Sequence, residues 1–374
     1  MNTEIFTLSH TIAQRIIGKS NQLNQQYRSV ESNISGEISS FREKKAALVS
    51  QKGHAVARKK SLKIVGFFYK TLEDEILGYF SANGHQAKIF ENIEDLKKHN
   101  EQYDIFFTVS NFVSSQEFLS QVIEYTINYG GNGISCIWLW DHHHVIGGSL
   151  SMATYFDIVF PIHETAADYL KVTNSHVMNS IPAATYQFGP TYDTERFYRT
   201  AGGAARSDGL YGGFREYPNM DRNTIIKECM EKIPGNSLYF CNPNNQNDQY
   251  YSLQTAEDRF LHWMRHKVSL SVSINTDIPI RIFDALCSGQ IPLVCSNLNG
   301  FDHIISPEDQ IALPIIRFPH YDVQEIRRAY ETALEYFDRD GAEGAYRRHT
   351  YAIRHHMMLK RVARMVTTIR LHFR

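Results

Sequence analysis

The sequence has 374 residues, of which 43% are hydrophobic and 21% are charged, and its formal net charge at pH 7 is −1. This length and composition are typical of a globular protein with about two domains and exclude a disordered chain. The net charge near zero gives no indication of a nucleic acid as partner, and no apolar run approaches the ~18–20 residues that span a bilayer.

The start of the chain and its cysteines favour the cytoplasm. Met1-Asn-Thr-Glu has neither the basic region nor the apolar region of a signal peptide. The five cysteines are scattered, form no CxxC pair, and resemble reduced thiols more than a disulfide framework. We therefore expect a cytoplasmic protein, free or at the inner face of the membrane.

Residues 1–61 are predicted to form a helical extension, with an apolar stripe at Ile5, Leu8, Ile12 and Ile16. Segment 40–63 is strongly basic. This extension can be interpreted as an amphipathic or coiled-coil arm that supports an oligomer, as a membrane-surface contact, or as a helix with a solvated basic face. The basic residues are Arg42, Lys44, Lys45, Lys52, Arg58, Lys59, Lys60 and Lys63.

A first α/β domain is predicted over residues 62–200. Apolar runs typical of buried strands alternate with helical patterns, which predicts a parallel, doubly wound sheet. The loop after the first strand, Lys70-Thr-Leu-Glu-Asp-Glu, has no GxGxxG pattern, which argues against a dinucleotide-binding dehydrogenase. The expected strands are 64–69, 86–90, 103–109, 134–140 and 155–160, and the expected helices are 73–80, 115–129 and one that runs to 170.

A second α/β domain is predicted over residues 201–345, and it begins with a small, polar linker at 201–209. A basic segment, 346–374, closes the chain, and its helix has either a membrane- or polyanion-binding face or a solvated basic face on a core-packed helix. The expected elements are a strand and turn at 210–214, strands 237–241, 268–274, 291–295 and 311–316, and helices 224–232, 256–265, 281–287, 322–338 and 342–371.

The loop at 275–281 follows a strand and precedes a helix. In parallel sheets, ligands bind where loops leave the carboxyl ends of the strands. Arg281 and Asp284 are predicted to lie one helical turn apart on the same face. An arginine there can bind a phosphate, and a carboxylate can accept hydrogen bonds from sugar hydroxyls.

Several motifs resemble glycosyltransferases of the GT-B fold, in particular the "group 1" and spore-maturation-type enzymes. Residues 280–294 are similar to the family's donor-binding block, R-x-F-E-A-x-A-x-G-x-x-x-V. Pro190-Thr-Tyr-Asp193 with Phe197 resembles the signature at the end of the first domain, and 211–215 resembles the first strand and loop of the second. The resemblance implies two Rossmann-like domains that face each other across a cleft, and a last helix that returns to the first domain.

The resemblance also implies a nucleotide-sugar donor on the second domain and an acceptor on the first. Charge develops on the leaving phosphates, and backbone amides with an arginine can stabilise it without a metal. Thr276 and Asp284 stand where many members carry two glutamates, so retention or inversion is not predicted. The candidate donor residues are Gly212, Gly213, Arg215, Asn242, Asn275, Thr276, Arg281 and Asp284, and Arg222 is a further available cation.

Asp141-His142-His143-His144 follows a strand of the first domain, where the resembled family often places a catalytic histidine. This loop can be interpreted as catalytic, as a polar loop without a catalytic role, or as a zinc site, although adjacent histidines seldom bind one metal together. The loop 242–248 is either a reader of the nucleotide base or a polar surface loop. Candidate acceptor residues at strand ends are Tyr69, Lys70, Ser110 and Asn111.

Together these patterns predict a metal-independent glycosyltransferase with a nucleotide-sugar as co-substrate and no other cofactor. The acceptor would be a glycan, a lipid-linked molecule or a protein. Two alternatives stay open. One is a nucleotide-sugar epimerase or hydrolase of the same architecture, which would act without an acceptor. The other is a non-catalytic module that scaffolds an assembly.

Overall fold

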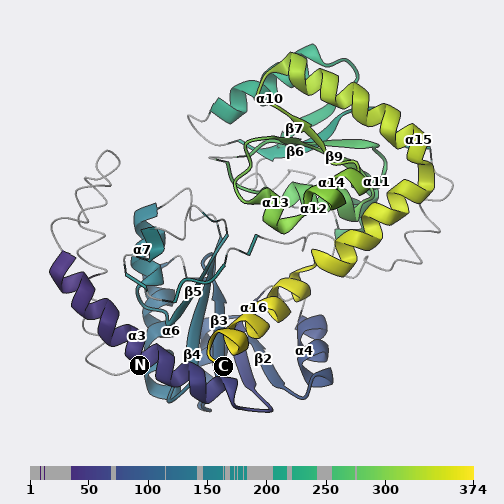
Figure 1. Cartoon of the computed structure of the whole chain (residues 1–374). Helices are drawn as coiled ribbons and strands as arrows, with labels where there is room; N and C mark the ends of the chain where they lie inside the picture. Colours follow the sequence, from purple (N-terminus) through teal and green to yellow (C-terminus); the bar gives the residue numbers. More distant parts are fainter. Residues whose placement is uncertain are drawn as a thin grey trace. The chain divides into compact units, whose positions relative to one another are not determined.

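The chain forms two compact units, each built on a five-stranded sheet (Figure 1). Unit 1 comprises Met1–Pro182 and Arg361–Arg374, and unit 2 comprises Ala183–Lys360. The computed structural model describes residues 35–68, 73–113, 115–140, 146–162, 205–216, 221–241, 255–273 and 276–374, with Ser9, Ile12 and short pieces between 164 and 182.

The sheet of unit 1 is parallel, with the strand order β2-β1-β3-β4-β5. Its strands β3, β4 and β5 are buried along their whole length, which explains why they read as continuous apolar runs in the sequence. The strands are β1 Lys63–Phe67, β2 Gln86–Phe90, β3 Ile105–Val109, β4 Ile134–Leu139 and β5 Ile158–Pro161, and the helices are α3 Ser35–Ala57, α4 Glu73–Ala82, α5 Ile93–Lys98, α6 Gln116–Tyr129 and α7 Ile146–Ala153.

The sheet of unit 2 is also parallel and has the order β10-β9-β8-β6-β7. Counted from its own first strand, this is the same winding as in unit 1. The strands are β6 Tyr211–Arg215, β7 Ser237–Cys241, β8 Val268–Ser271, β9 Ile291–Cys295 and β10 Ile316–Phe318, and the helices are α10 Asp221–Lys232, α11 Ala256–Met264, α12 Ile280–Cys287, α13 Phe301–Ile304, α14 Pro307–Ala312 and α15 Val323–His355. The last helix, α16 Met358–His372, begins in unit 2 and belongs to unit 1 from Arg361 onward.

Two predicted elements at the end of unit 2 were wrong. The expected strand at 311–316 begins as helix α14, because Ser306 caps the helix by accepting from the Asp309 amide and Pro307 opens its first turn. The strand of this region, β10, follows α14 and begins only at Ile316. The expected single helix at 342–371 is divided: α15 continues through a kink at Gly341 to His355, and α16 begins at Met358.

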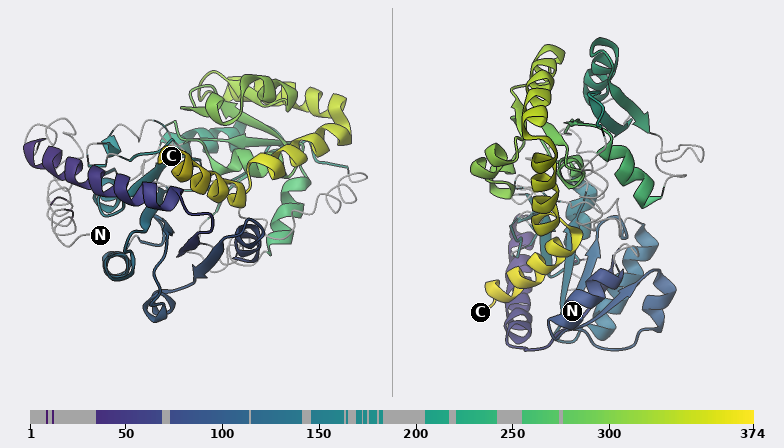
Figure 2. Two further views of the ribbon diagram at one scale, coloured as in Figure 1. Left: turned by 60° about the horizontal axis from the view of Figure 1, so that its bottom comes forward. Right: turned by 90° about the vertical axis from the view of Figure 1, so that its right-hand side faces the viewer.

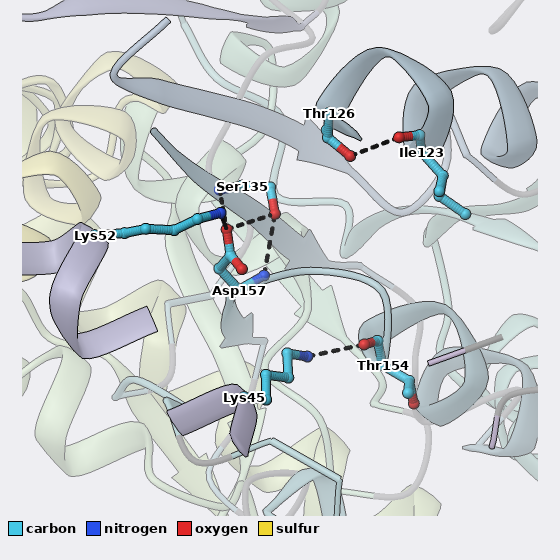
Figure 3. Close-up of polar contacts among 7 residues, drawn as sticks. All are labelled: Lys45, Lys52, Ile123, Thr126, Ser135, Thr154 and Asp157. Atoms are coloured by element: carbon cyan, nitrogen blue, oxygen red, sulfur yellow. Dashed lines mark hydrogen bonds and ion pairs between the residues drawn. The ribbon is translucent and has the colours of Figure 1, made fainter. Parts of the chain in front are cut away.

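Helix α3 is an integral part of unit 1, and two of its lysines point inward (Figure 3). Lys52 forms a buried ion pair of 3.2 Å with Asp157, whose carboxylate also accepts from the amide and the hydroxyl of Ser135. Lys45 donates to the carbonyl oxygen of Thr154 at 2.8 Å and lies over the Phe41 ring. The interpretation of this segment as only a solvated basic face is therefore wrong at these two positions, while Arg42, Lys44 and 58–60 are exposed.

Burial and nearby charges together set the pKa values of Lys45 and Asp157. Burial lowers the pKa of Lys45 to about 7, against the opposing attraction of Asp157. Burial alone would raise the pKa of Asp157, but Lys52, the Ser135 amide and Lys45 hold it below its ordinary value. Lys52 therefore compensates a buried negative charge, whereas Lys45 is a buried amine that loses its proton readily.

The end of α16 packs against α3 in unit 1 (Figure 2). His54 Nδ1 bonds the carbonyl oxygen of Phe373 at 2.6 Å, and the Phe373 ring fills the space beside Gly53 where a Cβ would lie 2.3 Å from it. The basic terminal segment is accordingly partly core-packed, with Arg361 among its buried residues. No described helix has the length and apolarity needed to cross a lipid bilayer.

All five cysteines are buried and unpaired, as the sequence predicted. Burial raises the pKa of the Cys136, Cys229, Cys287 and Cys295 thiols, which keeps them protonated and unreactive at neutral pH.

Candidate functional site

Several candidate donor residues that the structure describes lie at the carboxyl edge of the sheet in unit 2. The chain leaves β6 toward β7 on one side of the sheet and returns with β8 on the other side. The carboxyl ends of β6 and β8 therefore flank the topological switch point, where parallel sheets bind their ligands. Arg215 ends β6, and the loop that follows β8 leads through Thr276 to Arg281 in the first turn of α12.

Arg281 connects helix α12 with strand β6. Its Nε donates a hydrogen bond of 2.6 Å to the carbonyl oxygen of Gly213, and its guanidinium lies 5.0 Å from the centre of the Phe214 ring. Arg222, at the start of α10, lies 5.5 Å from the same ring. Phe214 thus places two guanidinium groups near the end of β6, where Arg215 adds a third, exposed cation.

Gly212 and Gly213 lie inside β6, so the expected glycine turn is wrong. A Cβ on Gly212 would lie 2.7 Å from the Phe214 ring, and one on Gly213 would lie 2.8 Å from the Tyr239 hydroxyl. The structure thus gives both glycines a packing reason, because neighbouring aromatic side chains occupy the space that a larger residue would need. A direct contact of these glycines with a donor stays a prediction.

Thr276 has a left-handed backbone conformation, with φ at 64°. This conformation is a strained outlier for a β-branched residue, and such outliers cluster at ligand-binding sites. Its carbonyl oxygen accepts a hydrogen bond from the Asn299 amide at 3.0 Å, which connects the loop after β8 with the loop after β9. The strain places Thr276 among the residues to test for donor contact.

Asp284 occupies the position of the family's carboxylate, but its side chain is fully buried, with 0% exposure. Burial raises the pKa of the neighbouring Cys287 thiol, and the charge of Asp284 raises it further. For the Asp284 carboxylate to accept a hydrogen bond from a sugar hydroxyl, its neighbours would have to move, and this role stays a prediction.

Tyr321 holds the loop after β8 and was not predicted as a site residue. Its hydroxyl lies 2.7 Å from the Ser273 hydroxyl and accepts from the Ser273 amide at 2.9 Å. Burial raises the pKa of Tyr321 to about 12, so the phenol stays protonated at neutral pH. No sequence pattern marks this pair, because the two residues are 48 positions apart.

In unit 1, Ser110 and Asn111 follow β3 at the equivalent switch point between β1 and β3. Ser110 is 6% exposed, and its hydroxyl accepts from the Trp140 amide at 2.8 Å and donates to the Trp140 carbonyl at 2.9 Å. Through these bonds Ser110 fixes the backbone of Trp140, which directly precedes Asp141–His144 in the sequence. The sequence did not predict this structural role. Asn111 is exposed, as an acceptor contact requires.

Several predicted site residues lie outside the described residues: Asp141, His142, His143, His144, Tyr69, Lys70, Asn242 and Asn275. Pro190-Thr-Tyr-Asp193 and Phe197 also lie outside them. Within the described part of the chain, no group of three or more His, Cys, Asp or Glu side chains could hold a metal ion. Independence of a metal stays a prediction.

Known structures similar to this chain span both units. An alpha-glucosyltransferase in complex with UDP and a 13-mer DNA matches 82% of this chain and 99% of its own, with a TM-score of 0.53 and 12% identity. Sucrose-phosphate synthase from Thermosynechococcus elongatus matches 83% and 99%, with a TM-score of 0.52 and 12% identity. The catalytic domain of Starch Synthase IV from Arabidopsis thaliana, bound to ADP and acarbose, matches 84% and 99%, with a TM-score of 0.51 and 11% identity.

These similarities show that the chain has the GT-B fold, with two Rossmann-like units, as the sequence motifs predicted. No protein-family model and no curated protein matches the sequence.

Proposed function

We propose that this chain, which has the GT-B fold, is a glycosyltransferase that moves a sugar from a nucleotide-sugar donor to a glycan, lipid-linked or protein acceptor. The observation that carries the proposal is the arginine cluster at the switch point of unit 2. Arg281, Arg222 and Arg215 gather at the carboxyl ends of β6 and β8, and Arg281 is held there by the Gly213 carbonyl. This is where a parallel sheet binds a ligand, and the charge of the cluster suits a diphosphate.

The chemistry follows from the charge that develops in the reaction. Transfer breaks the bond between the sugar's anomeric carbon and a phosphate oxygen, so negative charge grows on the leaving diphosphate. Arginines that are already in place stabilise that charge without reorganising during the reaction. The hydrogen bond from Nε to Gly213 orients the Arg281 guanidinium and uses only one of its N–H donors, so that its other donors can meet a phosphate.

The remaining roles are assigned from the sequence. Asp284 would hold donor hydroxyls, and a histidine of 142–144 would take the proton of the acceptor hydroxyl. Two of the similar structures contain bound UDP and bound ADP, which supports a nucleoside diphosphate sugar as the donor. We propose that no metal takes part, because the arginines supply the positive charge at the leaving group.

Thermal shift with uridine, adenosine, guanosine and cytidine diphosphates, and with cytidine monophosphate, tests this proposal. At 100 times its Kd, a nucleotide stabilises the folded protein by about 2.7 kcal/mol, which raises Tm by a few degrees. We expect this for at least one nucleotide, and a much smaller shift for Arg281→Ala. No shift with any of them would contradict the proposal and favour the scaffolding alternative. Turnover of the sugar donor without an acceptor would favour an epimerase or hydrolase.

A further inference from the structure

The carboxyl end of helix α12 is held by three basic side chains from distant parts of unit 2. His349 Nδ1 donates to the carbonyl oxygen of Cys287 at 2.5 Å, Arg206 Nη1 donates to that of Ser288 at 3.0 Å, and Arg348 Nε donates to that of Gly289 at 3.1 Å. The last carbonyls of a helix have no partners within the helix and carry its negative partial charge. Cations and a histidine N–H are therefore suited to this end.

Arg206 and Arg348 both lie against the Phe337 ring, and Arg348 has one carboxylate, that of Asp340, nearby. The guanidinium groups of Arg348 and Arg206 lie 5.3 Å and 5.4 Å from the Phe337 ring. Arg348 has 0% exposure, and its Nη1 lies 3.6 Å from the Asp340 carboxylate. Burial and the charge of Arg206 together lower the pKa of Arg348 to about 9, and burial lowers the pKa of Arg206 to about 10.

This arrangement is costly, because buried cations lose their hydration and repel each other. The carbonyl oxygens of residues 287–289 supply much of the compensation. If α12 rotated or slid by one residue, the three donors would lose these acceptors together. Arg206, Arg348 and His349 therefore act as a clamp that fixes the carboxyl end of α12 in one register.

The amino end of the same helix carries Arg281. Helix α12 has eight residues and a length of about 12 Å, so it transmits the position of one end to the other as a rigid body. The end that is clamped lies at the amino edge of the sheet, where Ser207 pairs with His266 ahead of β8. The other end lies at the carboxyl edge, where Arg281 reaches the Gly213 carbonyl.

We propose that Arg206, Arg348 and His349 are positioning residues of the donor site, because they set the register of α12 that brings Arg281 to the diphosphate of the donor. This inference rests on the proposed function for its ligand. It assigns a role in donor binding to residues that lie at the opposite edge of the sheet from the donor. A purely structural cap would stabilise the fold and leave the affinity for the donor unchanged.

Arg206 is the best residue to test, because its loss leaves the donors Arg348 and His349 in place. Arg206→Gln removes the cation, and Arg206→Lys retains one. Arg370→Gln is the matched control, since Arg370 is equally exposed and also donates to a carbonyl just after a helix end, that of Lys59, but belongs to unit 1. Arg348→Gln provides a second variant at the clamp.

The first readout is the Kd of UDP and of ADP, measured by calorimetry well below Tm. For Arg206→Gln we expect a Kd about 3- to 12-fold higher, equivalent to one hydrogen bond. Arg206→Lys should fall between it and wild type, and Arg370→Gln should match wild type. In an Arg281→Ala background the effect of Arg206→Gln should shrink to about twofold or less, because the clamp acts through Arg281.

The second readout needs no nucleotide, so failure of the proposed function and failure of this inference can be told apart. Hydrogen exchange of the first turn of α12 should become at least about threefold faster in Arg206→Gln and stay unchanged in Arg370→Gln. The inference is overturned if Arg206→Gln lowers Tm without changing exchange at this turn. It is also overturned if the Kd rises by the same factor with and without Arg281. Absence of nucleotide binding to the wild-type protein would overturn the proposed function instead.

Discussion

The hydrogen bond from Arg281 Nε to the carbonyl oxygen of Gly213, at 2.6 Å, connects the first turn of α12 with the carboxyl end of β6. It spans the switch point of the sheet and orients a guanidinium that also lies against the Phe214 ring. A side chain held by both an acceptor and a ring loses less freedom when it binds a ligand. Arg281 is therefore prepared for an anion at this edge.

Arg281→Ala and Arg281→Lys should differ in a characteristic way. The alanine variant loses a charge-assisted bond to the diphosphate, worth about 1.5–3 kcal/mol, so its Kd for the nucleotide should rise about 10- to 150-fold. The lysine variant keeps the charge but cannot bond Gly213 and a phosphate with one planar group, so it should recover only part of the affinity. Calorimetry with the best nucleotide of the panel checks this. Full recovery by lysine would contradict the orienting role of Gly213.

Ser110→Ala should impair turnover more than donor binding. The hydroxyl is bonded to both backbone groups of Trp140, and the residues that follow Trp140 include the candidate catalytic histidines. A displacement of about 1 Å at such a loop can lower kcat by up to about 100-fold. Ser110→Thr retains the hydroxyl and should stay close to wild type. Steady-state kinetics at saturating donor measures both, and equal kcat values for the alanine variant and wild type would contradict this role.

The two buried lysines of α3 should respond differently to replacement by methionine. Lys52→Met leaves the Asp157 carboxylate buried without its cation, which should cost about 3–5 kcal/mol of unfolding free energy. Lys45→Met should cost less, about 1–3 kcal/mol at pH 7, because it leaves the buried oxygens of Thr154 and Asn174 without their donor but leaves no buried charge unpaired. Urea denaturation of both variants compares them directly. Equal losses would mean that the ion pair with Asp157 is not the dominant contact.

His349 should contribute to acid sensitivity. Burial lowers its pKa to about 4, so the folded protein keeps this imidazole neutral while the unfolded chain takes up a proton near pH 6.5. The stabilisation is thus fully present above pH 6.5 and is lost as the pH falls toward 4, with a slope of up to about 1.4 kcal/mol per pH unit.

His349→Asn isolates this contribution. The asparagine amide can take the place of Nδ1 as donor to the Cys287 carbonyl, but it does not titrate. Urea denaturation between pH 4.5 and 7.5 should therefore show a shallower pH dependence for the variant, by close to one proton. Parallel curves for the two proteins would contradict a neutral, buried His349.

Gly53→Ala should destabilise the protein although alanine is the better helix former. The new Cβ would lie 2.3 Å from the Phe373 ring and would displace it. Gly36, in the same helix, has open space around it, so Gly36→Ala should stabilise by about 0.5–1 kcal/mol. In a Phe373→Ala background, Gly53→Ala should also become stabilising. Thermal denaturation of the four variants shows whether this change of sign occurs, and its absence would contradict the packing of α16 on α3.

The general fold could be predicted because most buried strands are continuous apolar runs between helical patterns. Strand β9, for example, is buried at all five positions and follows a clear glycine stop. The error at 311–316 had a readable signal: Ser306-Pro307 with two acidic residues after it marks a helix start. The apolar residues that follow outweighed this signal in the prediction of a strand.

Contacts between distant residues were out of reach of the sequence. Lys45 and Lys52 belong to a basic helix, and a run of charges normally indicates a solvated face. Their burial depends on Asp157, which lies 105 positions after Lys52. The clamp on α12 is similar, since Arg206 falls in a stretch whose composition predicted a flexible linker, although Ser207 pairs with His266 in the structure. No local pattern encodes such partners.

Hydrogen exchange of the wild-type protein, with and without each nucleotide-sugar of a panel based on UDP, ADP, GDP and CDP, tests the central claim most directly. We predict that at least one donor slows exchange at 211–216 and in the first turn of α12, at the carboxyl edge of the unit 2 sheet. Protection confined to unit 1, or no protection with any donor, would contradict a donor site at Arg281 and with it the assignment as a glycosyltransferase.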